Sequence, residues 1–170
     1  MISFRQLSFS KITRVKTTVL VFALMLSLLL ASCGKKYLYD DVHTLPADGW
    51  NKNQKERFIF NVPDTTSTFL FYLHVRNEID YRYSNLYVFM ETQFPNGNIT
   101  RDTLECILAA PSGKWTGRGY GRLKESMILL NPTIKFPLKG SYTIDIEQAM
   151  RDEILEGITD VGIRIERNPR

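Results

Sequence analysis

Residues 69–75, Phe-Leu-Phe-Tyr-Leu-His-Val, decide the fold class of this chain. Large apolar side chains occupy every second position, and the positions between them are also largely apolar. A period of two is the pattern of a β-strand, because successive side chains of a strand point to opposite faces of the sheet. The stretch therefore predicts a strand in the middle of a sheet whose second face is partly covered, with His74 as a half-buried residue that has a hydrogen-bond partner.

Similar alternating runs occur on both sides of this stretch, at the spacing expected for short strands. On its N-terminal side the run is 58–62, and on its C-terminal side the runs are 86–92, 99–108, 123–130, 134–138, 141–147 and 159–166. The sequence predicts that the apolar side chains of each run face a common core.

Turn signals separate these runs. Pro95-Asn96-Gly97 predicts a hairpin turn, because Gly97 can adopt a positive φ. Asn131-Pro132 predicts another turn, and residues 148–156 predict one or two helical turns that end at Gly157. Many short strands and almost no helix predict an all-β fold, an antiparallel β-sandwich, with a jelly roll as the preferred form.

The chain begins with the features of a bacterial secretory signal. Four cations and no acid precede an apolar run of twelve residues, 19–30, and small residues follow it. This order of charged start, apolar centre and small-residue cleavage site is typical of a signal peptide. The run is shorter than the roughly 20 apolar residues that span a bilayer. We therefore predict that residues 1–32 form a signal helix that packs on nothing and is cleaved.

The cleavage site itself resembles the lipobox of bacterial lipoproteins. Leu30-Ala31-Ser32 precedes Cys33, whose thiol in that family of sites receives a diacylglycerol before the new amino group is acylated, for example with palmitate. The resemblance implies that Cys33 is the first residue of the mature protein and tethers it to a membrane. Two or more acyl chains hold a protein firmly. The alternatives are an ordinary signal peptide with a chance cysteine and an uncleaved anchor.

After Cys33 the chain is polar and has no sustained period as far as Gln54, and it contains Pro46 and Gly49. This composition favours a flexible tether. The predicted division is therefore a signal peptide in residues 1–32, a lipidated N-terminus and tether in 33–54, and a β-sandwich domain in 55–170.

Removal of the signal changes the charge of the protein. The whole chain has 22 Lys and Arg against 18 Asp and Glu, and the signal contains four of the cations and none of the acids. The mature chain is therefore neutral overall. Without a basic stripe or an excess of cations, nucleic-acid binding is excluded. Its 138 residues are enough for one domain with one core.

The remaining chemistry of the chain is sparse. Cys106 has no partner for a disulfide once Cys33 is acylated, and its place in an alternating run predicts a small buried side chain. Asp40, Asp41 and His43 on a tether make a poor metal site. No nucleophile motif of the type Gly-x-Ser-x-Gly is present. We therefore predict no enzyme activity, no cofactor and no metal.

Residues 110–122 form a segment rich in glycine that also contains aromatic and cationic side chains. A phosphate-binding loop would need Gly where Leu108 stands and Ser or Thr in place of Trp115, so that motif fails. A dinucleotide fingerprint fails too, because Arg122 stands in place of its last glycine. Two interpretations remain: a hairpin or crossover whose Trp caps the sandwich, and an exposed contact surface.

If the segment is a contact surface, its aromatic and arginine side chains are the candidate contacts. Tyr, Trp and Arg contribute most of the binding energy in protein interfaces. The candidate partner-binding residues, taken from this segment and from a second aromatic cluster, are Tyr81, Tyr83, Trp115, Arg118 and Tyr120. The partner would be another envelope protein, and the alternative function is that of a glycan-binding jelly-roll lipoprotein.

A series of short motifs makes the mature chain resemble the gliding motility lipoprotein GldH family of Bacteroidetes. In chain order they are Trp50, Phe58, Asp64, Arg76, Tyr81-Arg82-Tyr83-Ser84-Asn85-Leu86, Pro95-Asn96-Gly97, Asp102-Thr103-Leu104, Gly113-Lys114-Trp115-Thr116-Gly117, Gly140-Ser141-Tyr142, Met150-Arg151, Leu155-Glu156-Gly157-Ile158 and Val161-Gly162. The resemblance implies a non-enzymatic subunit of the envelope machinery behind surface gliding, which overlaps with type IX secretion. It supplies no catalytic residue.

The residues after Cys33 indicate which membrane holds the anchor. Lys35 occupies the second position after Cys33, where an Asp favours retention in the inner membrane of some bacteria. Surface-export signals in this phylum tend to place acids close behind the Cys, whereas Lys35 and Lys36 come first here. We therefore predict an outer-membrane lipoprotein that faces the periplasm.

Overall fold

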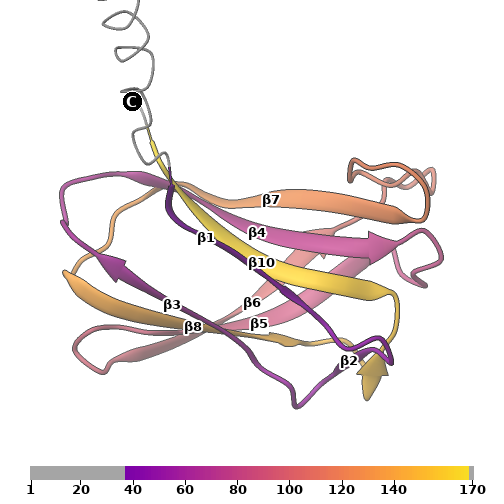
Figure 1. Ribbon diagram of the computed structural model, residues 1–170, viewed down its shortest axis with the longest axis horizontal. Helices are drawn as coiled ribbons and strands as arrows, with labels where there is room; N and C mark the ends of the chain where they lie inside the picture. The colour runs from indigo at the N-terminus through magenta and orange to yellow at the C-terminus, as the bar shows by residue number, and fades with distance from the viewer. Residues whose placement is uncertain (1–36, 169–170) are drawn as a thin grey trace, which may run out of the picture. The chain divides into compact units, whose positions relative to one another are not determined.

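The structure is a computed structural model that describes residues 37–168. The predicted signal peptide and Cys33 lie outside these residues. The described part of the chain contains ten strands and no helix, hence no helix long and apolar enough to cross a membrane (Figure 1). The strands are β1 Tyr37–Thr44, β2 Trp50–Asn51, β3 Glu56–Val62, β4 Phe69–Glu78, β5 Asn85–Gln93, β6 Ile99–Ile107, β7 Leu123–Ile134, β8 Gly140–Gln148, β9 Ile154–Leu155 and β10 Ile158–Arg167.

Two four-stranded antiparallel sheets face each other. Their strand orders are β1-β10-β4-β7 and β3-β8-β5-β6, and the short strands β2 and β9 pair separately. If the eight long strands are numbered in chain order, these orders become 1-8-3-6 and 2-7-4-5. This is the order of a jelly roll, in which two Greek keys wrap into a double sheet. The predicted antiparallel sandwich and its jelly-roll form are confirmed.

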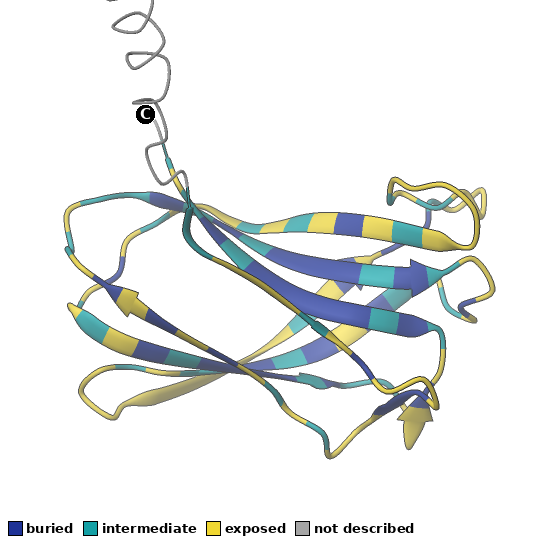
Figure 2. Ribbon diagram, in the orientation of Figure 1, coloured by how far each residue is buried: buried dark blue, intermediate teal, exposed yellow. Residues whose placement is uncertain are grey.

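The core lies between the inner faces of the two sheets (Figure 2). The stretch that decided the fold is β4, and it has β10 on one side and β7 on the other. Its inner side chains, from Phe69 to Val75, are at most 7% exposed. On its outer face His74 is 4% exposed, and its Nε2 lies 2.9 Å from Glu125 Oε1. The predicted central strand with two covered faces is therefore confirmed.

Ion pairs cover much of the outer faces. On the sheet that contains β8, Arg57 donates two hydrogen bonds of 2.8 Å to Asp145, which is 6% exposed. On the opposite sheet, Arg76 lies 3.3 Å from Asp160. The hydrocarbon stems of such arginines cover apolar surface while their charged ends stay in contact with water.

The domain begins earlier than the predicted boundary at residue 55. Residues 37–44, which were expected to form a tether, are β1 and pair with β10 from Tyr37 to Thr44. The pairing is close at Gly162, where an added Cβ would lie 2.9 Å from Val42 Cα. Trp50 is fully buried, and its Nε1 donates a hydrogen bond to Gln54 O at 3.1 Å. The tether prediction is thus wrong for residues 37–54.

The predicted turn at Asn131-Pro132 and the predicted strand 134–138 are also wrong. β7 continues through Pro132 to Ile134, with a shift of its register against β4. Pro132 is tolerated because β7 is an edge strand, which needs no donor on its free side. The residues that follow form a connection from which Phe136 enters the core, with its ring 5.1 Å from that of Tyr142.

Residues 148–156 form no helix, in contrast to the prediction. Gln148 donates a side-chain hydrogen bond of 2.7 Å to Asp152 O, and Ile154–Leu155 is the strand β9 that pairs with β2. Gly157 has a φ of +83°, and an added Cβ would lie 3.1 Å from Tyr81 Cα. This glycine is therefore required by a turn and by close packing, and it does not end a helix.

Antiparallel pairing sends successive connections to alternate ends of the sandwich. We call the end where β1 begins the near end, because it is nearest to Cys33 in the chain; its connections are residues 63–68, 94–98 and 135–139. The far end contains the connections 45–55, 79–84, 108–122 and 149–157. Figure 1 shows the near end on the left, where the first residues of β1 and the last of β10 meet.

Candidate contact surface at the far end

Three far-end connections that are distant in sequence meet in space. Leu108 N donates to Ser84 O at 2.8 Å, which joins the glycine-rich segment to the β4–β5 connection. Glu78 N donates to Gly157 O at 2.8 Å, which joins β4 to the turn before β10. All five candidate partner-binding residues lie in these connections, so the structure brings them to one end of the domain.

Tyr81 lies in the core and not on the surface. It is 5% exposed, and its hydroxyl donates a hydrogen bond of 3.0 Å to Asn85 O. Its ring contacts the rings of Tyr83 and Trp115, with centroids 5.7 and 6.5 Å away. Burial raises the pKa of the Tyr81 hydroxyl above its usual value. Tyr81 thus supports the surface from below.

Tyr83 and Trp115 are half-buried. The Tyr83 hydroxyl donates a hydrogen bond of 2.8 Å to Asp152 Oδ2 and so ties two connections together. Trp115 packs against the core and forms a backbone bridge with Ala109. For this residue, the interpretation of a Trp that caps the sandwich agrees with its place in the fold.

Arg118 and Tyr120 have exposed side chains on a backbone that is held in place. Tyr120 is 101% exposed. Arg118 exchanges two backbone hydrogen bonds with Glu125, of 2.8 and 2.7 Å, which fix the segment to β7. Beside it, an added Cβ on Gly117 would lie 2.9 Å from Glu125 O. The glycine content therefore lets the segment lie flat against the strand, and these two side chains are presented outward.

An acidic cleft of about 280 Å³ lies beside Tyr83. The carboxylates among its lining residues are Glu78, Asp80, Asp152 and Glu156, and Arg82 also lines it. The Asp80 backbone N–H and, to a lesser extent, the Arg122 guanidinium lower the pKa of the Asp80 carboxyl. The cleft is therefore negatively charged at neutral pH and suits a cationic group. Within residues 37–168 no three potential ligands are placed to hold a metal ion.

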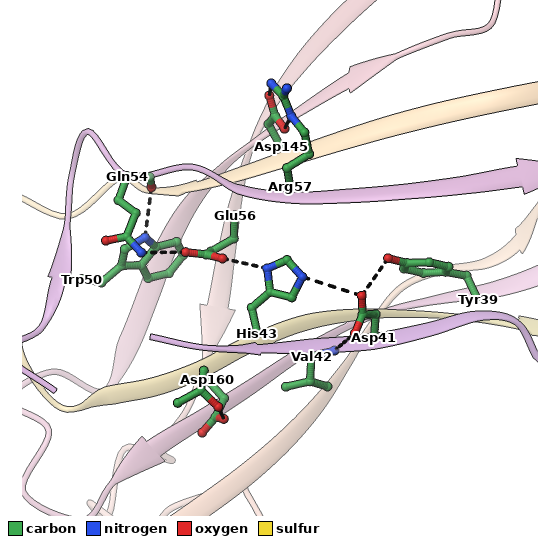
Figure 3. Close-up of polar contacts among 11 residues, drawn as sticks. Tyr39, Asp41, Val42, His43, Trp50, Gln54, Glu56, Arg57, Asp145 and Asp160 are labelled. Carbon is green, nitrogen blue, oxygen red and sulfur yellow. Dashed lines mark hydrogen bonds and ion pairs between the residues drawn. The ribbon is translucent and has the colours of Figure 1, made fainter. Parts of the chain in front are cut away.

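The two histidines and the cysteine of residues 37–168 lie on three different strands, β1, β4 and β6. His43 is on β1, with Nδ1 2.7 Å from Glu56 Oε2 and Nε2 3.6 Å from Asp41 Oδ2 (Figure 3). His74 is on the outer face of the sheet. Cys106 is fully buried, as predicted, and burial raises the pKa of its thiol to about 12.

The acids of the cleft were not predicted from the sequence. Asp152 lies in residues 148–156, for which helical turns were predicted, and Asp80 was not singled out. In an antiparallel sandwich, connections an even number of strands apart fall at the same end. The observed strands satisfy this rule for residues 79–84, 108–122 and 149–157. The predicted break at Asn131-Pro132 counted one strand too many between 108–122 and 149–157 and would have placed them at opposite ends.

Comparison with known proteins assigns the family. The sequence model of the GldH lipoprotein family matches residues 37–165, which begin with the first residue of β1. The chain belongs to the GldH lipoprotein family. A gliding motility lipoprotein GldH homolog of Christiangramia forsetii is 39% identical over 148 residues, covering 83% of this chain and 90% of that protein. The gliding motility lipoprotein GldH of Flavobacterium johnsoniae is 35% identical over 151 residues, covering 85% and 93%.

The match to the GldH family confirms the resemblance found in the sequence motifs. Its first matched residue also agrees with the corrected start of the domain, since the match includes β1. Both relatives are named as lipoproteins, in keeping with a membrane-anchored protein of the cell envelope.

Proposed function

We propose that this protein is a non-catalytic subunit of the gliding machinery and of the type IX secretion apparatus that overlaps with it, and that it acts by binding other envelope proteins. Acyl chains on Cys33 hold it in the outer membrane, and the domain faces the periplasm. The family and the names of both relatives support a role in gliding. Lys35, at the second position after Cys33, supports the outer membrane.

The proposal rests on one observation: the candidate contact residues lie at the far end of the sandwich, opposite to the near end where β1 begins. Strands of nine or ten residues, such as β4 and β5, separate the far end from the near end by about 30 Å at roughly 3.3 Å per residue. The exposed Arg118 and Tyr120 therefore lie at the end opposite to the first residue of β1, where a partner can reach them. A fixed backbone lowers the entropy cost of binding, so these two residues are the proposed main contacts.

The proposal is tested by crosslinking in intact cells and recovery of the tagged lipoprotein. The variant Arg118→Ala/Tyr120→Ala should lower partner recovery about tenfold or more, as expected when interface hot spots are removed. The matched control is Arg101→Ala/Ile99→Ala, an exposed cation and an exposed apolar residue of β6. Equal recovery from both variants would remove the far end from the proposal.

The anchor needs a separate test. Cys33→Ser should abolish incorporation of labelled palmitate into the protein while the domain stays folded, because Cys33 precedes the first strand. Undiminished labelling of this variant would contradict lipid attachment at Cys33.

A further inference from the structure

We infer that the near end of the sandwich binds anionic lipid headgroups and so holds the domain upright on the membrane. This inference rests on the proposed lipid anchor at Cys33. The occupant of the surface is the membrane itself, and its recognised chemistry is the phosphate or carboxylate of a headgroup.

Chain length keeps the near end close to the membrane. Only Gly34, Lys35 and Lys36 stand between Cys33 and Tyr37, the first residue of β1. Four residue steps reach at most about 14 Å even when the chain is fully extended. A lipid on Cys33 therefore brings the start of β1, and with it the near-end connections, to the headgroup region.

The charges of the mature chain are distributed unevenly, although they cancel overall. The near-end connections, together with the flanking residues 34–36 and 168–170, contain five Lys or Arg and one Asp. The ten strands contain six Lys or Arg and twelve Asp or Glu. The far-end connections contain seven Lys or Arg and five Asp or Glu, so the larger net positive charge is at the near end. An anionic surface therefore attracts the near end most and repels the faces of both sheets, which opposes a domain that lies flat.

The two near-end lysines in the described part of the chain are free to bind an anion. Lys135 and Lys139 are exposed, and neither side chain has a hydrogen bond or an ion pair within residues 37–168. The one near-end acid, Asp64, accepts hydrogen bonds from Ser67 N at 2.7 Å and Thr66 Oγ1 at 3.0 Å. Within residues 37–168 the cation nearest to this carboxylate is Arg167, at 4.0 Å. Asp64 therefore does not neutralise either lysine.

This orientation connects the two ends in function. With the near end on the headgroups, the far end with Arg118 and Tyr120 lies about 30 Å further from the membrane. In a domain that lay flat, one sheet face would cover the membrane and the far-end segment would be close to it. The near end thus determines where the proposed contact surface is presented.

The test uses the mature lipoprotein in vesicles with a fluorophore on one introduced cysteine. Cys106 is buried and Cys33 carries the lipid, so the label reacts at the new site alone. The sites are Asn96→Cys at the near end and Tyr120→Cys at the far end, both exposed. Quenching by headgroup-linked acceptors is compared in phosphatidylcholine and in mixtures with phosphatidylglycerol.

In anionic vesicles we expect strong quenching at Asn96→Cys and weak quenching at Tyr120→Cys. The difference should shrink in neutral vesicles and at 1 M salt, where the Debye length falls to about 3 Å. Each lysine near an anionic surface changes the population roughly fivefold, so Lys135→Glu/Lys139→Glu should abolish the difference. The control Lys114→Glu/Arg151→Glu, at exposed far-end positions, should leave it unchanged.

The outcomes separate this inference from the proposed function. If the protein floats with the vesicles but both labels are quenched equally, whatever the lipid charge, the upright orientation is wrong and the anchor stands. If Tyr120→Cys is quenched more strongly than Asn96→Cys, the far end faces the membrane and the inference is overturned. If the protein does not float with vesicles at all, the lipid anchor itself has failed.

Discussion

The sandwich has two seams between its sheets, and they are built differently. At the β1–β3 seam the ring of His43 lies 4.4 Å from that of Phe58, and Tyr39 lies 5.4 Å from Phe60. At the β6–β7 seam, grooves of about 400 and 660 Å³ separate the edge strands, and seven of the nine β6 residues are exposed. One seam is closed by side chains, and the other is open to water.

The difference shows how β1 stabilises the fold. A chain of polar contacts connects β1 to β3 (Figure 3). Tyr39 donates a hydrogen bond to Asp41, Asp41 lies 3.6 Å from His43, and His43 is hydrogen-bonded to Glu56. Gln54 extends the chain toward Trp50. Burial, and next Asp41, raise the pKa of Tyr39 to about 12. No comparable chain joins the described residues of β6 and β7. The segment that was expected to be a tether is therefore the one that closes the core.

Truncation of a closed-seam side chain should have the largest effect. Phe58→Ala removes a fully buried ring that packs on His43, and we expect a loss of about 3–5 kcal/mol in the free energy of unfolding. The open-seam counterpart Leu104→Ala, at a half-buried position, should cost less than half of that. Urea unfolding of the Cys33→Ser protein measures both, and equal losses would contradict the contrast between the seams.

The reaction rate of the Cys106 thiol tests whether β6 separates from the core at the β6–β7 seam. Cys106 lies on β6 and is fully buried, and its pKa of about 12 compares with a usual value of 9.0. Thiolate is the reactive form, so at pH 8 the native protein should react with iodoacetamide about a thousandfold more slowly than the urea-unfolded protein. Mass spectrometry over time measures the ratio. Comparable rates would mean that the β6 edge separates from the core.

Exposed apolar residues on the β7 edge should contribute least to stability. Met127 and Leu129 are 36% and 47% exposed. Met127→Ser/Leu129→Ser should change the free energy of unfolding by no more than about 0.5 kcal/mol per site. The variant should also aggregate less, since exposed apolar edge strands promote pairing between chains. A loss of several kcal/mol would show that the β6–β7 seam is closed in solution.

The sequence predicted the strands that have one or two apolar faces. β4 and β8 have enough alternating apolar residues to be recognised alone, and their order and length limited the fold to a sandwich. β1 was not recognised because the polar residues Asp41 and His43 stand on its inward face and the apolar Val42 on its outward face. Its partners also lie more than a hundred residues away, on β10. Such pairing is a tertiary property, and local patterns do not contain it.

The sequence predicted only part of the candidate surface, because the burial of a side chain is also a tertiary property. Residue type and glycine content pointed to residues 110–122, and Arg118 and Tyr120 are exposed there. The burial of Tyr81 depends on Gly157 and Trp115, which reach it from two other connections. The exposure of a side chain is determined by contacts between distant segments. Residue type alone therefore could not distinguish a buried supporting residue such as Tyr81 from an exposed contact residue such as Tyr120.

The position of Cys33 four residues before β1 has a mechanical consequence. Tension between the membrane and a partner at the far end would act along the axis of β1. Hydrogen bonds of an antiparallel ladder are perpendicular to the strands, so the β1–β10 pairs from Tyr37 to Thr44 would resist that pull together, in shear, and would not break one after another. With the proposed anchor at Cys33, β1 would thus be the element through which such a force enters the domain.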